Sequence, residues 1–310
     1  MTVVVAGSTG LVGSALTEAF TAAGHDVVGL NRSIVNLLDL EATKRVIQKI
    51  KPDLVIDAAA KVGGIGANNT LPVEFLSDNI RIQSNLMEAA HAATVKKFVF
   101  LGSSCIYPRD CPQPIKEEYL LTGPLESTNS AYAIAKIAGI ELINSYRKEY
   151  GAKWISLMPT NLYGPRDNFD LQTSHVLPAL IRRFVEAVEN RSAKVVLWGS
   201  GSPKREFLHV NDLAQAVLKA SENYDSSMHL NIGSGIDLTI RELAGKVATS
   251  TGFTGEIEWD TSNPDGTPQK VLDVSKIKAL GWEPTIRLED GIASTVAWYK
   301  GASARGEVRK

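Results

Sequence analysis

Three glycines directly after a short apolar run constrain this chain more than any other feature. The run Thr2–Ala6 predicts a strand, and Gly7-Ser8-Thr9-Gly10-Leu11-Val12-Gly13 then opens a helix predicted over Leu11–Ala23. In such a turn the glycines permit a tight bend, let backbone N–H groups approach a pyrophosphate, and pack helix against strand. The alternative is a purely structural turn. The strand-turn-helix context favours dinucleotide binding.

The first half of the chain repeats this alternation of apolar runs and amphipathic stretches. Further strands are predicted at His25–Leu30, Leu54–Ala58, Lys97–Leu101 and Trp154–Met158. Helices are predicted at Leu40–Ile50, Ile80–Ala93 and Ala131–Tyr150. Because several runs are too continuous for a half-wet surface, we expect an α/β fold of the Rossmann type, a doubly wound parallel sheet with helices on both faces.

The alternation ends after Thr160, where Gly, Pro and Asn punctuate the chain. We therefore expect a nucleotide-binding Rossmann domain over residues 1–165 with a return at 206–228. A smaller, mixed C-terminal lobe is expected from residues 166–205 and 229–310 and would bind the substrate. One helix is predicted there at His175–Glu189, and Asn263-Pro264-Asp265-Gly266 predicts a turn.

Composition narrows the class of protein. The 310 residues carry a formal net charge of -1, which argues against a nucleic-acid binder. No segment approaches the roughly 18 to 20 apolar residues that cross a bilayer, and no signal peptide is recognisable. The only two cysteines, Cys105 and Cys111, suggest neither a disulfide framework nor a four-ligand zinc site. We expect a cytoplasmic protein without a metal.

The end of the second predicted strand distinguishes NAD from NADP. An Asp or Glu there would accept a hydrogen bond from the ribose 2′-hydroxyl, but this chain has Asn31-Arg32. A guanidinium suits a 2′-phosphate, and no carboxylate is present to repel it. NADP is therefore favoured, and the alternative is that Arg32 is a solvated loop residue.

Ser103-Ser104 after a strand and Tyr132-x-x-x-Lys136 on a helix predict a catalytic centre. Tyr132 and Lys136 are four residues apart and share one helical face. A free phenol titrates near pH ~10, and we expect the ammonium to favour the phenolate. Ser103 can hold a substrate carbonyl, and Lys136 can also bind the nicotinamide ribose.

A cysteine follows the serines, at the place where a proton-shuttling group could face a sugar. A thiolate can abstract a proton from a carbon α to a ketone. His175 is a reasonable acid partner, because imidazole titrates near neutrality. Taken alone, Cys105 could equally be a small buried hydrophobe, and His175 a surface residue at a helix start.

Long, ordered matches then identify a family. The chain resembles the GDP-L-fucose synthase family of extended short-chain dehydrogenases/reductases, whose glycine spacing is also GxxGxxG. The matching segments are Ala58–Ile65, Ala67–Thr70, Gly102–Pro108, Tyr132–Gly139, Met158–Pro165, Trp198–Gly201, Arg205–Val210 and Pro264–Pro268.

The resemblance implies a two-stage reaction on GDP-4-keto-6-deoxy-D-mannose. Cys105 and His175 match the base and acid that epimerise C3 and C5, both α to the C4 ketone. Ser103, Tyr132 and Lys136 match the residues that serve reduction at C4 by NADPH, which gives GDP-L-fucose. Inversion must precede reduction, because the ketone acidifies the neighbouring C–H bonds.

The resemblance also implies the binding residues. Substrate contacts fall at Arg183, Trp198, Arg205 and Asp273. Cofactor contacts fall at Gly7, Ser8, Thr9, Gly10, Leu11, Val12, Gly13, Arg32, Leu101, Gly102, Ser103, Ser104, Lys136, Pro159, Thr160, Asn161, Leu162 and His175. Some family members have a basic residue in the first glycine loop where this chain has Ser8-Thr9, which leaves Arg32 to contact the 2′-phosphate.

Two other functions compete with this one. A 4-epimerase with tightly held NAD would consume no reduced cofactor and would leave Cys105 and His175 without roles. A non-catalytic dinucleotide sensor would be expected to lack Tyr132 or Lys136, and both are present. The family usually pairs helices of two subunits, so we expect a homodimer through the helices Ile80–Ala93 and Ala131–Tyr150.

Overall fold

The larger part of the molecule is built around a six-stranded parallel sheet. The structure of the chain, a computed structural model, describes residues 1–262 and 265–308. The strand order is β2-β1-β3-β4-β5-β9. The bounds are β1 (Thr2–Ala6), β2 (Asp26–Leu30), β3 (Leu54–Asp57), β4 (Lys97–Leu101), β5 (Ile155–Pro159) and β9 (Leu230–Ile232). Strand addition reverses between β1 and β3, and ligands of such sheets bind outside the carboxyl ends at that point.

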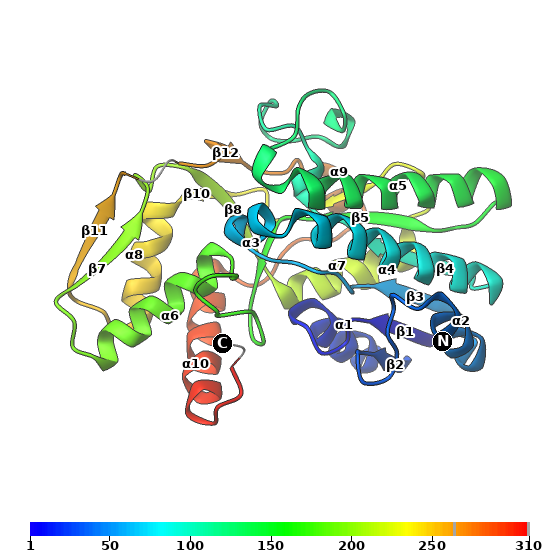
Figure 1. Cartoon of the computed structure of the whole chain (residues 1–310), viewed down its shortest axis with the longest axis horizontal. Coiled ribbons are helices and arrows are strands. Elements are labelled where there is room, and N and C mark those ends of the chain that lie inside the picture. Colours follow the sequence, from blue (N-terminus) through cyan, green and yellow to red (C-terminus); the bar gives the residue numbers. More distant parts are fainter. Residues whose placement is uncertain (263–264, 309–310) are drawn as a thin grey trace.

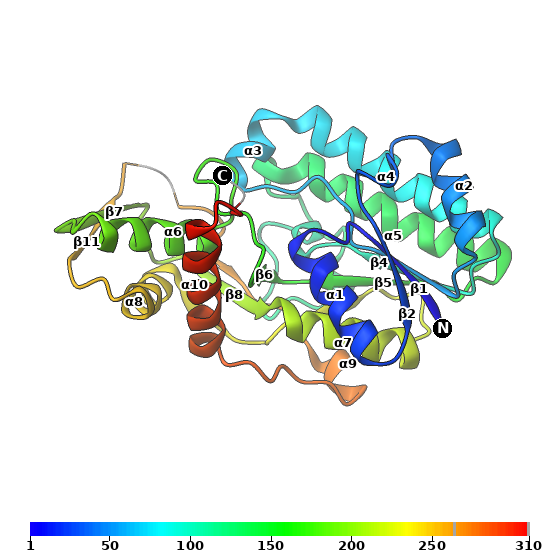
Figure 2. The same cartoon turned by 90° about the horizontal axis from the view of Figure 1, so that it is seen from below.

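Helices cover both faces of this sheet, as the apolar strands require. Val3, Val4 and Val5 are fully buried, which a one-sided sheet would not allow. In Figure 2, α1 and α7 lie on one side, and α2, α4 and α5 on the other. Their bounds are α1 (Leu11–Ala22), α2 (Leu40–Ile50), α4 (Pro72–Ala92), α5 (Ser130–Tyr150) and α7 (Val210–Asn223). The predicted doubly wound Rossmann fold is confirmed.

Helix α4 begins eight residues before the predicted start at Ile80. Pro72 occupies the first helical turn, where its missing N–H costs nothing. The first turn exposes Val73, so the apolar periodicity becomes visible only further along the chain. A short helix, α3 (Ile65–Thr70), precedes it and was not predicted.

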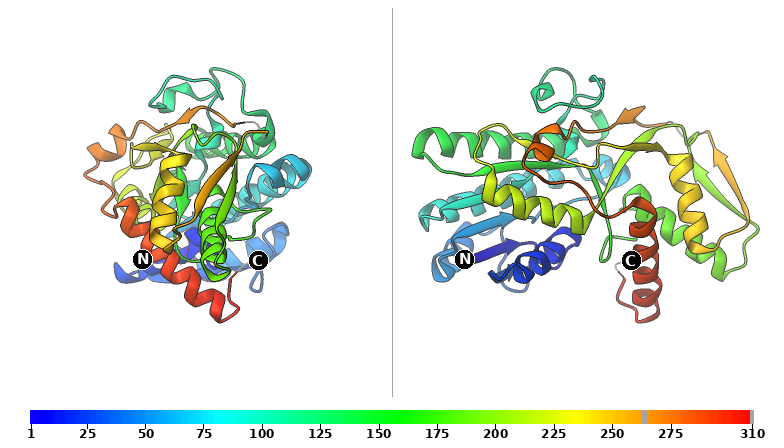
Figure 3. Two further views of the ribbon diagram at one scale, coloured as in Figure 1. Left: turned by 90° about the vertical axis from the view of Figure 1, so that its left-hand side faces the viewer. Right: turned by 180° about the vertical axis from the view of Figure 1, so that it is seen from behind.

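A second, smaller core forms at the other end of the molecule (Figure 1). It is built around buried aromatic residues, including Phe169, Phe184 and Tyr299. Figure 3 shows α8 (yellow) and α10 (red) together at this end. The helices are α6 (Val176–Glu189), α8 (Ile240–Thr251) and α10 (Leu288–Ala304). A two-stranded parallel sheet joins β7 (Lys194–Trp198) to β11 (Glu256–Asp260).

Strand β8 (Lys204–His209) links the two cores. It pairs with β6 (Asn161–Tyr163), β10 (Asp237–Thr239) and β12 (Gln269–Lys270). The chain then returns to the large sheet through α7 and β9, and α9 (Ser275–Ala279) packs beside β9. Segments beyond residue 229 thus contribute to both cores.

Short 3₁₀ turns and loops complete the chain. The turns are η1 (Ser104–Ile106), η2 (Glu117–Tyr119) and η3 (Ser127–Asn129). Asn263 and Pro264, half of the predicted four-residue turn, lie outside the described residues. Within residues 1–262 and 265–308, no helix is long and apolar enough to cross a membrane. The same residues contain no group of three or more His, Cys, Asp or Glu side chains that could hold a metal ion.

The buried carboxylate of Asp212 on α7 anchors the segment that leads to α10. It accepts hydrogen bonds from the N–H groups of Thr285 and Ile286, and from the Thr285 hydroxyl. We expect Asp212→Ala to lower the free energy of unfolding by about 2–4 kcal/mol in urea titrations, because two backbone donors lose their partner. The exposed Glu222→Ala on the same helix should change it by less than about 0.5 kcal/mol. Equal effects of the two variants would contradict this account.

Candidate active site

The turn between β1 and α1 has the shape of a pyrophosphate cradle. Gly7 has a φ of +80°, and a Cβ atom there would lie 2.7 Å from the carbonyl oxygen of Ala58. A Cβ on Gly13 would collide with the Gly7 carbonyl. Gly10 precedes α1 without a side-chain cap, so the first N–H groups of the helix keep no side-chain acceptor. These donors at a helix N-terminus fit the diphosphate of a dinucleotide.

The end of β2 presents a cation and no acid. Arg32 is exposed and has no hydrogen-bond or ion-pair partner among the described residues. Asn31 forms the local turn, with its Oδ1 accepting from the Ser33 N–H at 2.9 Å and from the Ser33 hydroxyl. A side chain at Gly29 would collide with Ser8, so the first glycine loop packs on β2. The donor set therefore fits a 2′-phosphate at Arg32.

The remaining predicted cofactor residues follow β4 and β5, the strands next along the sheet. Leu101 ends β4, and Gly102 to Ser104 continue from it. Pro159 ends β5, where the Thr160 N–H donates to the carbonyl of Ile232. Asn161 and Leu162 begin β6, and Asn161 donates to the Glu206 carbonyl at 2.8 Å. These residues line the same carboxyl edge of the sheet as the glycine turn.

Cys105 and Tyr132 lie in one cluster. Cys105 is half-buried in η1, and its backbone N–H donates to the Oγ of Ser103 at 3.2 Å. Burial is the main cause of the raised pKa of Tyr132, followed by the Cys105 side chain. Burial lowers the pKa of Arg205, and the Cys105 side chain opposes this effect by raising it. Thiol, phenol and guanidinium therefore share one electrostatic environment.

Lys136 is buried behind Tyr132 and points at the sheet. Its Nζ donates to the carbonyl of Leu101 at 2.9 Å and lies 4.8 Å from the centre of the Phe100 ring. The same atom is 5.8 Å from the centre of the Tyr132 ring. Burial lowers the pKa of Lys136, against the opposing charge of Asp57.

The expectation that Lys136 favours the phenolate of Tyr132 is wrong for this geometry. The pKa of Tyr132 is raised by burial, with smaller contributions from Cys105 and Asp57. The ammonium is engaged by the Leu101 carbonyl and does not contact the phenolic oxygen through any hydrogen bond between described residues. Tyr132 is thus a neutral phenol near pH 7, the form that donates a proton.

Asp57 is a charged residue of this cluster that the sequence reasoning did not single out. It ends β3, and its register partner on β4 is Phe100, so both side chains face α5. Burial raises its pKa to about 6, against the attraction of Lys136. Its Oδ1 accepts from the Ala59 N–H, and its buried Oδ2 has no hydrogen-bond partner among the described residues. An acid at the end of an otherwise apolar strand was the available signal.

His175 immediately precedes α6, the first helix of the smaller core. Its side chain is accessible to water, but the surrounding protein lowers the pKa of the imidazole by desolvation. The segment before it packs on the loop leading into α3, where the Gly64 N–H donates to the Thr173 carbonyl at 2.8 Å. Since α3 also contacts η3 at the start of α5, one segment touches both sides of the site.

The four predicted substrate residues occupy three different places. Arg183 on α6 donates to the Val196 carbonyl of β7, the strand that ends at the 70% exposed Trp198. Arg205 on β8 is half-buried near Cys105. Asp273 lies at the start of α9, where its Oδ1 accepts from the Ser275 N–H and hydroxyl. No contact joins Asp273 to the two arginines among the described residues.

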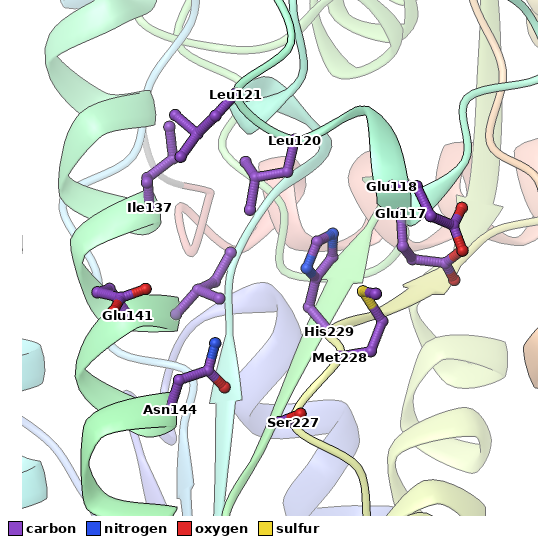
Figure 4. A pocket seen from close by; sticks show the side chains of 11 residues that line it. Glu117, Glu118, Leu120, Leu121, Ile137, Glu141, Asn144, Ser227, Met228 and His229 are labelled. Atoms are coloured by element: carbon purple, nitrogen blue, oxygen red, sulfur yellow. The ribbon is translucent and has the colours of Figure 1, made fainter. Parts of the chain in front are cut away.

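A separate pocket lies on another side of α5 (Figure 4). Ile137, Glu141 and Asn144 of α5 line it together with η2 and with Met228 and His229 before β9. Its lining includes none of the predicted site residues. The Tyr132–Lys136 face of the helix is therefore distinct from this pocket.

Comparison with known proteins agrees with this arrangement. Residues 3–233 match the model of the NAD dependent epimerase/dehydratase family. The chain belongs to this family of nucleotide-dependent enzymes.

The chain is also similar to individual proteins of known name. The chain is 51% identical over 296 residues to GDP-L-fucose synthase 1 of Arabidopsis thaliana, covering 95% of this chain and 92% of that protein. It is 49% identical over 307 residues to the GDP-L-fucose synthase of Escherichia coli, covering 96% of each. The crystal structure of a GDP-L-fucose synthetase from Naegleria fowleri bound to NADP superposes with a TM-score of 0.92. That match has 32% identity and covers 100% of this chain and 95% of the other.

Arg32 gives a direct test of the cofactor site. We expect Arg32→Ser to raise the KM for NADPH by about 10-fold or more, the loss of one charge-assisted hydrogen bond, and to leave the KM for NADH nearly unchanged. Steady-state kinetics with both cofactors measures this. Arg45→Ser, an exposed arginine on α2, is the matched control and should change neither. Equal losses with both cofactors in Arg32→Ser would contradict the assignment.

The raised pKa of Asp57 predicts a pH-dependent effect on stability. A carboxyl whose folded pKa is about 6 binds its proton more tightly when folded, so its contribution to stability is lost as pH rises from its unfolded pKa through 6. Asp57→Asn removes this titration. We compare the free energy of unfolding of Asp57→Asn with that of the parent in urea titrations. The excess of the variant should be on the order of 2 kcal/mol greater at pH 8 than at pH 4.5. An excess independent of pH would contradict it.

Proposed function

We propose that this chain converts GDP-4-keto-6-deoxy-D-mannose to GDP-L-fucose, by epimerisation at C3 and C5 followed by NADPH-dependent reduction at C4. The observation that carries the proposal is the cluster of Cys105 and Tyr132 beside Ser103. It combines a group that can remove a proton from carbon with one that can deliver a proton to oxygen. The cofactor cradle lies at the same edge of the sheet.

In the first stage Cys105 is the base and His175 the acid. The thiolate takes the proton from the carbon next to the ketone, and the electron pair moves into the enolate. The hydroxyl of Ser103 and the neutral phenol of Tyr132 can donate hydrogen bonds to the enolate oxygen. His175 then returns a proton from the opposite face of the ring, which inverts the centre. Its lowered pKa, caused by desolvation, makes it a strong donor once protonated.

In the second stage Tyr132 protonates the C4 oxygen. NADPH, when bound, supplies the hydride. Burial keeps Tyr132 protonated, because it raises the pKa of the phenol. Ser103 holds the oxygen while the proton moves, and Lys136 would hold the nicotinamide ribose. One set of hydroxyl groups thus serves both stages.

We infer that the smaller lobe binds the GDP part of the substrate. It is built on residues 166–205 and on the part of 229–310 that lies outside β9 and α9, which pack with the large sheet. Arg183 and Arg205 suit a diphosphate, and the exposed Trp198 offers an aromatic surface to a base. Arg183 donates a hydrogen bond to Val196 of β7, two residues before Trp198 on the same strand. Asp273 would contact the sugar nucleotide from the start of α9, where Ser275 already holds it.

A 4-epimerase that retains NAD is the second candidate, and a dinucleotide sensor the third. The 4-epimerase reaction gives no role to the Cys105 thiol near Tyr132. A dinucleotide sensor gives no reason for a buried Lys136 that donates to Leu101. Net consumption of NADPH separates the proposed reaction from both.

We further propose a homodimer that pairs α4 and α5 of each subunit. These helices pack on one another and expose apolar residues, Val73 on α4 and Ile134 on α5. Sedimentation in solution tests this pairing. A cytoplasmic location remains a prediction.

Cys105→Ser tests the reaction itself. With GDP-4-keto-6-deoxy-D-mannose and NADPH, we expect this variant to form GDP-L-fucose about 100-fold or more slowly, since the base is lost. Absorbance of NADPH and chromatography of the sugar nucleotide measure it. Cys111→Ser, the other free cysteine, is the control and should match the parent. GDP-L-fucose formed by Cys105→Ser at the parent rate would contradict the role of the thiol.

A further inference from the structure

Asn129 donates a hydrogen bond to the sulfur of Cys105. Its Nδ2 lies 3.6 Å from Sγ. Asn129 immediately precedes α5, so the start of the helix that carries Tyr132 also places this donor. The Cys105 N–H, which donates to Ser103, fixes the turn that presents the sulfur.

The side chain of Asn129 does not cap the helix that it precedes. An asparagine at this position ordinarily accepts a hydrogen bond from one of the first helical N–H groups, but α5 has no side-chain cap. The Oδ1 of Asn129 is buried without a hydrogen-bond partner among the described residues. A buried, unpaired acceptor costs free energy. The orientation that puts Nδ2 on the sulfur therefore leaves Oδ1 without the hydrogen bond that a helix cap would give it.

A positive charge acts on the same sulfur. Cys105 is the first of the charges that raise the pKa of Arg205 against the larger effect of burial. The guanidinium of Arg205 therefore lies near this sulfur. An N–H donor and a cation both stabilise a thiolate relative to the thiol.

We propose that Asn129 is a positioning residue for Cys105, holding the sulfur in place and stabilising the thiolate that removes protons from C3 and C5. This role rests on the proposed function. In the step, the carbon–hydrogen bond breaks, its proton forms the S–H bond of Cys105, and its electron pair enters the enolate. Without the Asn129 donor, proton removal becomes slower while substrate binding is unchanged. The kcat for exchange therefore falls, and KM stays the same.

Two variants separate this role from support of the helix. Asn129→Asp keeps the shape of the side chain but replaces the donor by a carboxylate, which at a helix start is favourable. Asn129→Ala removes the contact without adding charge. The matched control is Asn144→Asp, an asparagine on α5 whose Oδ1 is also buried and unpaired within the described residues. All are made in the Cys111→Ser background, which leaves Cys105 as the single thiol.

The first readout is the rate at which iodoacetamide alkylates Cys105 as a function of pH. We expect the midpoint to rise by about one pH unit or more in Asn129→Asp, less in Asn129→Ala, and not at all in Asn144→Asp. The second is deuterium exchange from solvent into the keto-sugar nucleotide, which should fall about 10-fold in Asn129→Asp at unchanged KM.

Alkylation curves of both Asn129 variants that coincide with the parent curve would overturn the proposal. Alkylation needs no substrate, so this outcome is independent of the reaction. A parent enzyme that exchanges no deuterium would refute the proposed function, and the catalytic role of Asn129 with it. A shifted alkylation midpoint would then still establish the stabilising contact.

Discussion

The hydrogen bond from the buried Lys136 ammonium to the Leu101 carbonyl fixes how α5 lies against the sheet. It joins the middle of the first half of the helix to the last residue of β4, at 2.9 Å. Tyr132, one turn earlier, is thereby held beside the chain that leaves β4 through Ser103 and Cys105. A buried cation is costly unless it is compensated, and the Leu101 carbonyl, the Phe100 ring and the charge of Asp57 provide that compensation. This one side chain thus joins the helix that carries Tyr132 to the strand that leads into Ser103 and Cys105.

The protonation states of the cluster suit a proton donor more than a phenolate. The phenol of Tyr132 is neutral near pH 7, and desolvation, followed by the charges of Cys105 and Asp57, raises its pKa further. Cys105 instead accepts a hydrogen bond from Asn129 and lies near the guanidinium of Arg205. In the proposed reaction the two groups have opposite tasks, one removing protons from carbon and the other giving a proton to oxygen.

Much of this could be predicted from the sequence, because local signals agree with the fold. The apolar runs predicted β1 and β4 with their observed bounds. The glycine turn and the Tyr132–Lys136 spacing predicted a cofactor end and a catalytic end, and these two remain predictions. The start of α4 was missed, since its first turn exposes Val73 and lacks the apolar period. The environments of Tyr132, Asp57 and Asn129 depend on register and burial between distant segments, which no local pattern records. For that reason the sequence predicted a lowered pKa for Tyr132, whereas its surroundings raise it.

The most direct test of the central claim is the reaction of the parent enzyme in deuterium oxide with GDP-4-keto-6-deoxy-D-mannose and NADPH, followed by NMR of the sugar nucleotide. GDP-L-fucose that carries solvent deuterium at both C3 and C5 is the expected product, because each inverted carbon receives its new hydrogen from a group that exchanges with solvent. A product reduced at C4 without deuterium at these two carbons would contradict it. The fold and the cofactor site would then stand, but the proposal that Cys105, Tyr132 and His175 serve two stages of one reaction would not.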